Sequence, residues 1–233
     1  DAVQAAGGEV VYHRLSPENQ FDLTEDVLDD LDEGVDMAFF CTPNNPTGRI
    51  IDPTLMEGIL SRCREKKIRV VVDECFLSLA DPGEGAGFAG KLAEFPNLLL
   101  LRAFTKSYAM PGLRLGYCLS GDETLMDQLS CCAQPWSVSG PAQAAGLAAL
   151  REPLHPVLAR ELIAVERAWL TGQLRDMGLR PFPSLANYIL FQAPGRGDLK
   201  ARLLERGALI RSCTNYVGLG EDYYRVAVRL RPE

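Results

Sequence analysis

The stretch IRVVVDE (residues 68–74) decides how the chain is expected to fold. A short apolar run rich in β-branched residues, without alternating polar positions, is typical of a strand buried on both faces of a parallel sheet. The run ends in two carboxylates, Asp73 and Glu74. Because ligands of open α/β sheets bind beyond the carboxyl ends of the strands, the sequence predicts that Asp73 faces a ligand crevice.

Further predicted elements alternate between strands and helices on both sides of this run. Upstream, the sequence predicts strands over residues 9–15 and 37–41, a helix from Thr24 to Leu31, and a helix from Asp52 to Lys67 that starts with a favourable Asp-Pro pair. Downstream, it predicts strands over 97–101 and 115–120 and helices over 122–132, 142–150 and 156–177. This alternation is typical of an α/β fold with a mixed, mostly parallel sheet.

The last third of the chain has a different pattern. Strands are predicted around residues 187–191 and 224–228, with a helix near 197–206 between them. The long charged helix over 156–177 is expected to connect this small α+β unit to the sheet before it. We therefore predict a large domain over residues 1–150 and a small C-terminal domain over 151–233.

The composition argues against several classes of protein. A formal net charge of -7 disfavours binding to nucleic acids, because domains that bind them usually carry a basic surplus. No apolar run approaches the roughly 20 residues that a membrane span needs. Seven cysteines without C-x-x-C spacing suit reduced thiols rather than disulfides or a metal site. We therefore expect a cytoplasmic protein with no nucleic-acid or membrane partner and no metal.

Three polar clusters follow predicted strands. The loop TPNNPTG (42–48) contains Asn45, whose amide can donate a hydrogen bond. Asp73 ends the central run, and the segment RAFTKSYAMPGLRLGY (102–117) contains Lys106 and, eight residues later, Arg114. A partly desolvated lysine is a nucleophile, and a guanidinium suits a phosphate. Taken singly, each residue is explained at least as well as part of an ordinary turn, helix cap or surface ion pair.

Two arginines near the end of the chain flank a loop of small and polar residues. Arg211 lies in LIRSC (209–213), and Arg225 lies in YYRVAVR (223–229). Guanidinium groups beside a domain cleft can bind anions, and either arginine can equally be structural. The pair is therefore a candidate anion-binding site.

Together these segments resemble the fold-type I enzymes that depend on pyridoxal phosphate, the aminotransferase class I and II family, over essentially the whole chain. That family places an Asn before Pro-Thr-Gly, an Asp at a strand end, a lysine, and an Arg eight residues after it. Asn45, Asp73, Lys106 and Arg114 occupy these positions in the same order. The resemblance implies that Lys106 holds the cofactor as an imine and that Asp73 pairs with its pyridine nitrogen.

The resemblance also implies roles for the other candidates. Asn45 would donate to the cofactor's phenolate oxygen, and Arg114 would bind its phosphate. Relatives usually have a Ser or Thr three residues before the lysine, where this chain has Ala103, which leaves Thr105 as the nearby hydroxyl. On the substrate side, the family implies that an arginine near the C-terminus binds the carboxylate, and Arg225 matches it.

The resemblance to the family also implies two further substrate contacts. Asn187 is expected to help Arg225 hold the carboxylate. Arg211 matches an arginine upstream of the carboxylate arginine, and a substrate phosphate is its expected ligand.

Within the family, the chain resembles the threonine-phosphate decarboxylase branch, which is related to the histidinol-phosphate aminotransferases. Phe76 in DECF stands where most aminotransferases have a tyrosine that contacts the cofactor, and TKSYAMPGLRLGY and the PWSVS stretch around Trp136 resemble the decarboxylases. The resemblance implies decarboxylation of L-threonine O-3-phosphate in cobalamin biosynthesis. One alternative is an aminotransferase for histidinol phosphate or another amino acid. Another is a non-catalytic module of this fold or an inactive fragment.

The ends of the chain suggest a piece of a longer protein. It lacks the upstream third of the family, which contributes the glycine-containing phosphate loop and an N-terminal arm, and it stops soon after Arg225. The complete protein is expected to bind a small amino acid or phosphorylated amine. The family further implies that it is a homodimer with the active site at the subunit interface.

Overall fold

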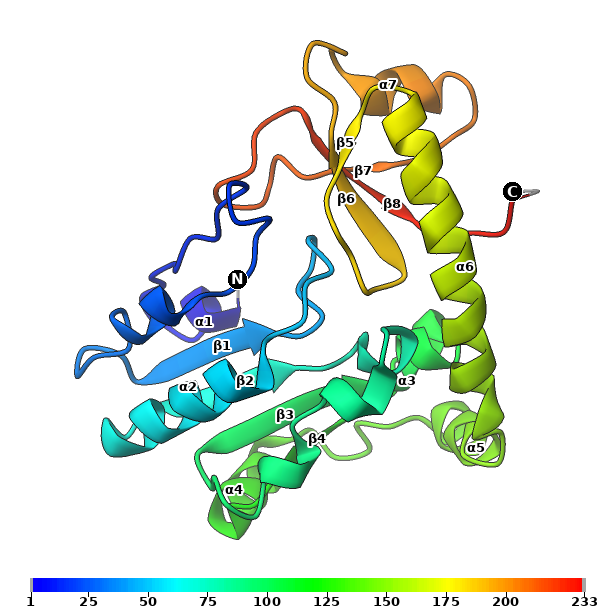
Figure 1. Cartoon of the computed structure of the whole chain (residues 1–233). Coiled ribbons are helices and arrows are strands. Elements are labelled where there is room, and N and C mark those ends of the chain that lie inside the picture. The colour runs from blue at the N-terminus through cyan, green and yellow to red at the C-terminus, as the bar shows by residue number, and fades with distance from the viewer. Residues whose placement is uncertain (1, 232–233) are drawn as a thin grey trace.

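The first sheet is formed by apolar runs, of which the central one has Val70, Val71 and Val72 buried. The computed structural model describes residues 2–231. In spatial order, the strands of this sheet are β1 (Met37–Cys41), β2 (Arg69–Asp73), β3 (Leu98–Ala103) and β4 (Gly116–Ser120). The first three strands run parallel and β4 runs antiparallel to β3 (Figure 1). The mixed, mostly parallel sheet predicted from the sequence is therefore confirmed.

Parallel neighbours need crossover connections, and the chain supplies two kinds. Between β1 and β2 the crossover is α2 (Pro53–Glu65), which Asp52 caps by accepting hydrogen bonds from the backbone N–H groups of Thr54 (2.8 Å) and Leu55 (3.0 Å). Between β2 and β3 it consists of the short 3₁₀ turns η2 (Leu77–Leu79), η3 (Gly83–Ala86) and η4 (Ala89–Lys91). The predicted Asp-Pro helix start is confirmed.

The main hydrophobic core lies between α2 and the parallel strands. Its central members are fully buried: Met56, Ile59, Leu60 and Cys63 of α2, Val70 and Val72 of β2, and Leu98 and Leu100 of β3. Full burial of one such large side chain contributes about 1.5–3 kcal/mol to folding. The core thus fixes α2 against one face of the sheet and holds the strands in register.

The parallel register aligns the carboxyl ends of three strands. Cys41 is opposite Asp73, and Asp73 is opposite Leu101. The chain leaving β1 is held there because the Thr42 N–H donates to the Asp73 carbonyl at 2.9 Å. Similarly, the Glu74 N–H donates to the Leu101 carbonyl at 2.8 Å. The segments that follow β1, β2 and β3 therefore emerge next to one another at one edge of the sheet.

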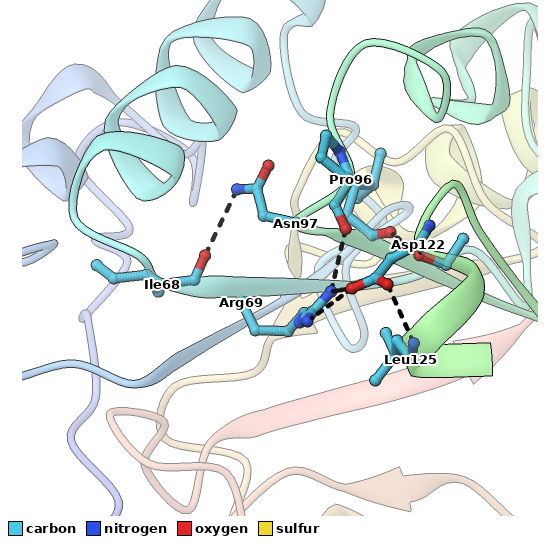
Figure 2. A network of polar contacts seen from close by, with 8 residues as sticks. Ile68, Arg69, Pro96, Asn97, Asp122 and Leu125 are labelled. Atoms are coloured by element: carbon cyan, nitrogen blue, oxygen red, sulfur yellow. Dashed lines mark hydrogen bonds and ion pairs between the residues drawn. The ribbon is translucent and has the colours of Figure 1, made fainter. Parts of the chain in front are cut away.

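The opposite edge of the sheet is held by a polar network (Figure 2). Arg69, at the start of β2, donates to the Pro96 carbonyl (3.0 Å) and to the Asp122 carboxylate (3.1 Å). Asp122 also accepts from the Leu125 N–H at 3.1 Å and so caps α4 (Glu123–Cys132). Asn97 donates to the Ile68 carbonyl at 3.4 Å. These contacts fix the starts of β2 and β3 relative to α4.

A second, antiparallel sheet follows in the C-terminal part of the chain. Its strands, in spatial order, are β5 (Arg180–Pro181), β6 (Tyr188–Gln192), β8 (Tyr223–Ala227) and β7 (Arg211–Ser212). The helix α7 (Leu199–Leu204) lies between β6 and β7 in the chain. This part has the predicted α+β character, and the short strands β5 and β7 were not predicted.

The long helix α6 (Leu154–Asp176) runs from α5 (Gly140–Ala149) alongside the second sheet (Figure 1). Its buried Arg167 donates to the carbonyls of Leu185 (3.2 Å) and Ala186 (3.1 Å), just before β6. The two sheets lie on either side of the predicted boundary between residues 150 and 151. The assignment of 1–150 and 151–233 to two domains stays a prediction. Within residues 2–231, no helix is both long and apolar enough to cross a membrane.

Two predicted elements near the N-terminus are wrong. The segment 9–15 is not a strand, because no strand within residues 2–231 pairs with it, and β structure requires a partner. The segment from Thr24 to Leu31 forms only the 3₁₀ helix η1 (Glu25–Leu28). Acidic side chains at Asp29, Asp30 and Asp32 disfavour further helix, since the C-terminal end of a helix repels negative charge. Before both lies the short helix α1 (Ala2–Ala5).

A buried ion pair ties the end of β2 to β3. Glu74 is only 3% exposed and accepts hydrogen bonds from the Phe88 N–H (2.7 Å) and from Arg102 (2.8 Å), which also pairs with Glu84 at 2.7 Å. Burial raises the pKa of the Glu74 carboxyl, and the contacts with Phe88 and Arg102 oppose that rise. Glu74 directly follows Asp73, and Arg102 lies four residues before Lys106. The ion pair therefore fixes how the segments that carry these two predicted site residues leave the sheet.

We predict that Arg102→Met lowers the free energy of unfolding by about 3–5 kcal/mol, because it leaves a buried carboxylate without its cation. Without Arg102 the pKa of Glu74 should rise further. The cost of burying the charged Glu74 carboxylate is then present above that pKa and disappears as the pH falls below it. The loss in free energy of unfolding should therefore be smaller in mildly acid buffer. Urea unfolding at two pH values measures this. The double variant Glu74→Leu/Arg102→Met should regain most of the loss; a double variant as unstable as the single one would contradict the argument.

Candidate active site

Asp73 and Lys106 leave neighbouring strands at the carboxyl edge of the first sheet. Asp73 is the last residue of β2, and its Oδ1 accepts a hydrogen bond from the Cys75 N–H at 2.9 Å, which orients the carboxylate. Lys106 lies in α3 (Phe104–Ser107), a single helical turn directly after β3. Its Nζ is 5.3 Å from the centroid of the Phe76 ring, which meets Tyr188 edge to face. The strand register thus brings Asp73 and Lys106 to the same edge of the first sheet.

The thiol of Cys75 lies within electrostatic range of both residues. Burial raises the pKa of Cys75 to about 12, and the neighbouring Asp73 carboxylate adds to the rise, while the Lys106 ammonium opposes it. A thiol with such a pKa stays protonated at neutral pH and is a poor nucleophile. Among the reactive groups here, the exposed Lys106 amine is therefore the better candidate for covalent chemistry.

Asn45 is presented by a tight turn after β1. The Gly48 N–H donates to the Asn44 carbonyl at 2.6 Å, and the Asn44 N–H donates to the Arg49 carbonyl at 2.7 Å. Gly48 has a φ of +74°, and a Cβ there would overlap the Ser184 side chain. The turn therefore requires glycine both for its backbone conformation and for the close approach of residues before β6.

The second sheet reaches this turn through Arg225. Arg225, on β8, donates from Nη1 to the side-chain oxygen of Asn45, and the Tyr216 hydroxyl donates to the same oxygen at 3.1 Å. The Arg225 guanidinium lies 5.1 Å from the centroid of the Tyr188 ring, whose hydroxyl donates to the Asn44 carbonyl at 3.0 Å. Burial raises the pKa of Tyr188, so it remains a hydroxyl donor. Residues from both sheets thus form one polar cluster.

Arg211 extends this positive region. It is opposite Arg225 in the pairing of β7 with β8, and directly opposed residues of an antiparallel pair project from the same face. The exposed Arg211 guanidinium lies 5.9 Å from the centroid of the Tyr216 ring. Two guanidinium groups on one face can bind two anionic groups of one ligand.

Three other predicted site residues are Arg114, Thr105 and Asn187. Arg114 has a φ of 54°, is exposed, and donates to the carbonyl of Pro111, the first residue of η5 (Pro111–Leu113), at 3.1 Å. Thr105 precedes Lys106 in α3 and is half-buried. The side-chain oxygen of Asn187 is buried and has no hydrogen-bond partner among residues 2–231. Cofactor or substrate contacts by these three residues stay predictions.

Two tyrosines of the cluster were not among the predicted site residues. Tyr188 comes directly after Asn187, and Tyr216 lies in the loop between Arg211 and Arg225. Their proximity to predicted residues was a signal, but aromatic side chains at such positions are more often part of a core. Their contacts with the turn after β1 join residues far apart in sequence.

Comparisons with known proteins show the family to which the chain belongs. The sequence profile of the family described as aminotransferase class I and II matches residues 1–233. The threonine-phosphate decarboxylase of Salmonella typhimurium is 37% identical over 230 residues, covering 98% of this chain and 63% of the relative. The histidinol-phosphate aminotransferase of Methanothermobacter thermautotrophicus is 36% identical over 216 residues, covering 91% of this chain and 56% of the relative.

A solved structure shows the same fold. The histidinol-phosphate aminotransferase from Clostridium acetobutylicum superposes with a TM-score of 0.92 at 25% identity, covering 99% of this chain and 69% of that one. The fold is an α/β scaffold, and the family that the chain matches depends on pyridoxal phosphate. The chain belongs to the aminotransferase class I and II family. It spans less than two thirds of the length of the two curated relatives named above.

We predict that Gly48→Ala destabilises the protein by about 1–3 kcal/mol, because alanine adopts a positive φ at a cost and its Cβ would displace Ser184. Urea unfolding measures the loss. Gly58→Ala is the matched control: Gly58 lies inside α2, has open space around it, and should gain roughly 0.5–1 kcal/mol on the same substitution. Equal effects of the two substitutions would contradict the constraint on the turn.

Proposed function

We propose that the whole protein is a pyridoxal phosphate enzyme in which Lys106 holds the cofactor covalently and Asp73 binds its pyridine nitrogen. The observation that supports this most is the convergence of Asn45, Asp73 and Lys106 at the aligned ends of β1, β2 and β3. These residues come from three separate segments, so no local motif explains their meeting. The match to the family over 1–233 supports the same proposal.

The donor set fits this cofactor. The Asn45 side-chain oxygen already accepts from Tyr216 and Arg225, so the amide nitrogen is the group left to donate to a phenolate oxygen. Asp73 Oδ1 accepts from Cys75, and Oδ2 can accept from a protonated ring nitrogen. Lys106 is an exposed amine beside the aromatic face of Phe76. For the phosphate, the proposed groups are Thr105 and Arg114, together with residues from the rest of the protein.

Pyridoxal phosphate, when bound, supplies a conjugated ring that withdraws electrons from the substrate's Cα. In this proposal, the Asp73 carboxylate keeps a proton on the ring nitrogen. Lys106 Nζ carries a proton to or from Cα once the substrate amine has taken its place. Arg225, helped by Asn187, orients the substrate carboxylate, and that orientation decides whether carbon dioxide or a proton leaves Cα.

The particular reaction we propose is decarboxylation of L-threonine O-3-phosphate, in the synthesis of cobalamin. This substrate carries a phosphate and a carboxylate, which correspond to the paired guanidinium groups of Arg211 and Arg225. Phe76 has no hydroxyl where most aminotransferases have a tyrosine, and the relative from Salmonella typhimurium supports the same reading.

Transamination of histidinol phosphate is the second candidate. It is supported by the 36% identical relative and by the solved structure with a TM-score of 0.92. Histidinol phosphate has a phosphate but no carboxylate, so it would engage Arg211 and leave Arg225 without an anion. A non-catalytic role is disfavoured by the presence of both Lys106 and Asp73.

Two further expectations accompany this proposal. The protein is proposed to act in the cytoplasm, where its seven cysteines would stay reduced. The whole protein is proposed to act on a small amino acid or phosphorylated amine and to form a homodimer.

The experiment compares substrates in the whole protein. We predict that Arg211→Ala weakens L-threonine O-3-phosphate binding by roughly ten- to a hundredfold, since a charge-assisted hydrogen bond contributes about 1.5–3 kcal/mol. Binding of plain threonine should hardly change, whereas Arg225→Ala should impair both ligands because both carry the carboxylate. Carbon dioxide release and steady-state kinetics measure these effects. Efficient transamination of histidinol phosphate without carbon dioxide release from threonine phosphate would refute the decarboxylase proposal.

A further inference from the structure

Tyr216 is held in place by the core of the second sheet. It lies in the loop between β7 and β8, where its N–H donates to the carbonyl of the fully buried Cys213 at 3.0 Å. Its own carbonyl accepts from the Leu219 N–H at 3.1 Å. The Tyr216 ring packs against the buried cluster that contains Phe182 and Tyr223. The direction in which the ring points is therefore fixed by packing rather than by its hydroxyl.

The Tyr216 hydroxyl and the Arg225 guanidinium together fix the orientation of the Asn45 amide. Oδ1 of Asn45 can only accept hydrogen bonds, and it accepts from Tyr216 and from Arg225. With the amide turned over, its NH₂ group would face the Arg225 guanidinium, which has only donors. The two donors together thus hold the oxygen toward the second sheet and leave the NH₂ group free to donate elsewhere.

The ring of Tyr216 meets a second residue of the proposed site. The Arg211 guanidinium lies 5.9 Å from its centroid, within the range of a cation–π contact. One side chain therefore touches the arginine proposed for the substrate phosphate through its ring, and the asparagine proposed for the cofactor through its hydroxyl. The two contacts use different atoms and can be removed separately.

We propose that Tyr216 is a positioning residue that locks the Asn45 amide so that its NH₂ group donates to the phenolate oxygen of pyridoxal phosphate. This inference rests on the proposed function. Tyr216 acts through Asn45 and touches neither the cofactor nor the reacting atoms. Its ring has a separate role, which is to hold the Arg211 guanidinium in place for an anionic group of the substrate.

The test is the pH titration of the cofactor's absorption band in the whole protein without substrate. A donor at the phenolate oxygen favours loss of the proton that this oxygen shares with the Lys106 nitrogen. Tyr216→Phe removes one of the two donors that hold Asn45, so the midpoint of the titration should rise by about half a unit to one unit. The KM for the phosphorylated substrate should stay unchanged, because the ring under Arg211 remains, while kcat falls severalfold.

Three controls make the result specific. Tyr223→Phe deletes a hydroxyl from the same core cluster and should leave the midpoint unchanged. In an Asn45→Ala background, Tyr216→Phe should produce no additional shift, because Tyr216 acts through Asn45. Tyr216→Leu should shift the midpoint as Tyr216→Phe does and also raise the KM of the phosphorylated substrate.

The outcomes separate this inference from the function on which it rests. A wild-type protein that shows no lysine-bound cofactor band overturns both. If the wild-type protein shows the band and its titration midpoint is the same in Tyr216→Phe, the inference alone is overturned. The inference is also overturned if Tyr223→Phe shifts the midpoint as much as Tyr216→Phe does. A third contradicting result is that Tyr216→Phe shifts the midpoint equally with and without the Asn45→Ala substitution.

Discussion

The parallel register of β1, β2 and β3 is the constraint on which the rest of the site depends. Cys41, Asp73 and Leu101 lie side by side, so the residues that follow them share one edge of the sheet. Asn45 is four residues beyond Cys41, and Lys106 is five beyond Leu101. A slip of one residue would turn every strand side chain to the opposite face. The buried core beneath α2 prevents that slip and so keeps the proposed site residues at one edge of the sheet.

Residues of the second sheet contact the turn that follows β1 in the first sheet. Arg225 reaches from β8 to Asn45, while the Tyr188 hydroxyl from β6 reaches the carbonyl of Asn44. Arg167 fixes the chain before β6 against α6, and Gly48 lets that chain approach the turn closely. A ligand between the sheets would therefore meet groups whose orientation is set before it binds, which lowers the ordering cost of binding.

Elements specified by local patterns were predicted well. The apolar run of β2 and the Asp-Pro start of α2 each carry their own signal in a few residues. The segment 9–15 has the composition of a strand, but its state depends on a partner elsewhere, which composition does not reveal. The order of Asn45, Asp73, Lys106 and Arg114 in the sequence was the basis for the proposed site. The contact of Tyr216 with Asn45 joins residues 171 positions apart, so the position of Tyr216 near Arg211 and Arg225 did not reveal this partner.

The central claim is that Lys106 is the covalent attachment point of pyridoxal phosphate. The most direct measurement is borohydride reduction of the whole protein with its cofactor, followed by mass mapping of the tryptic peptides. We predict that the added pyridoxyl mass lies on Lys106, within the peptide of residues 103–114 that results when trypsin no longer cleaves after the modified lysine. Stable labelling of another lysine instead, or no labelling at saturating cofactor, would contradict the account.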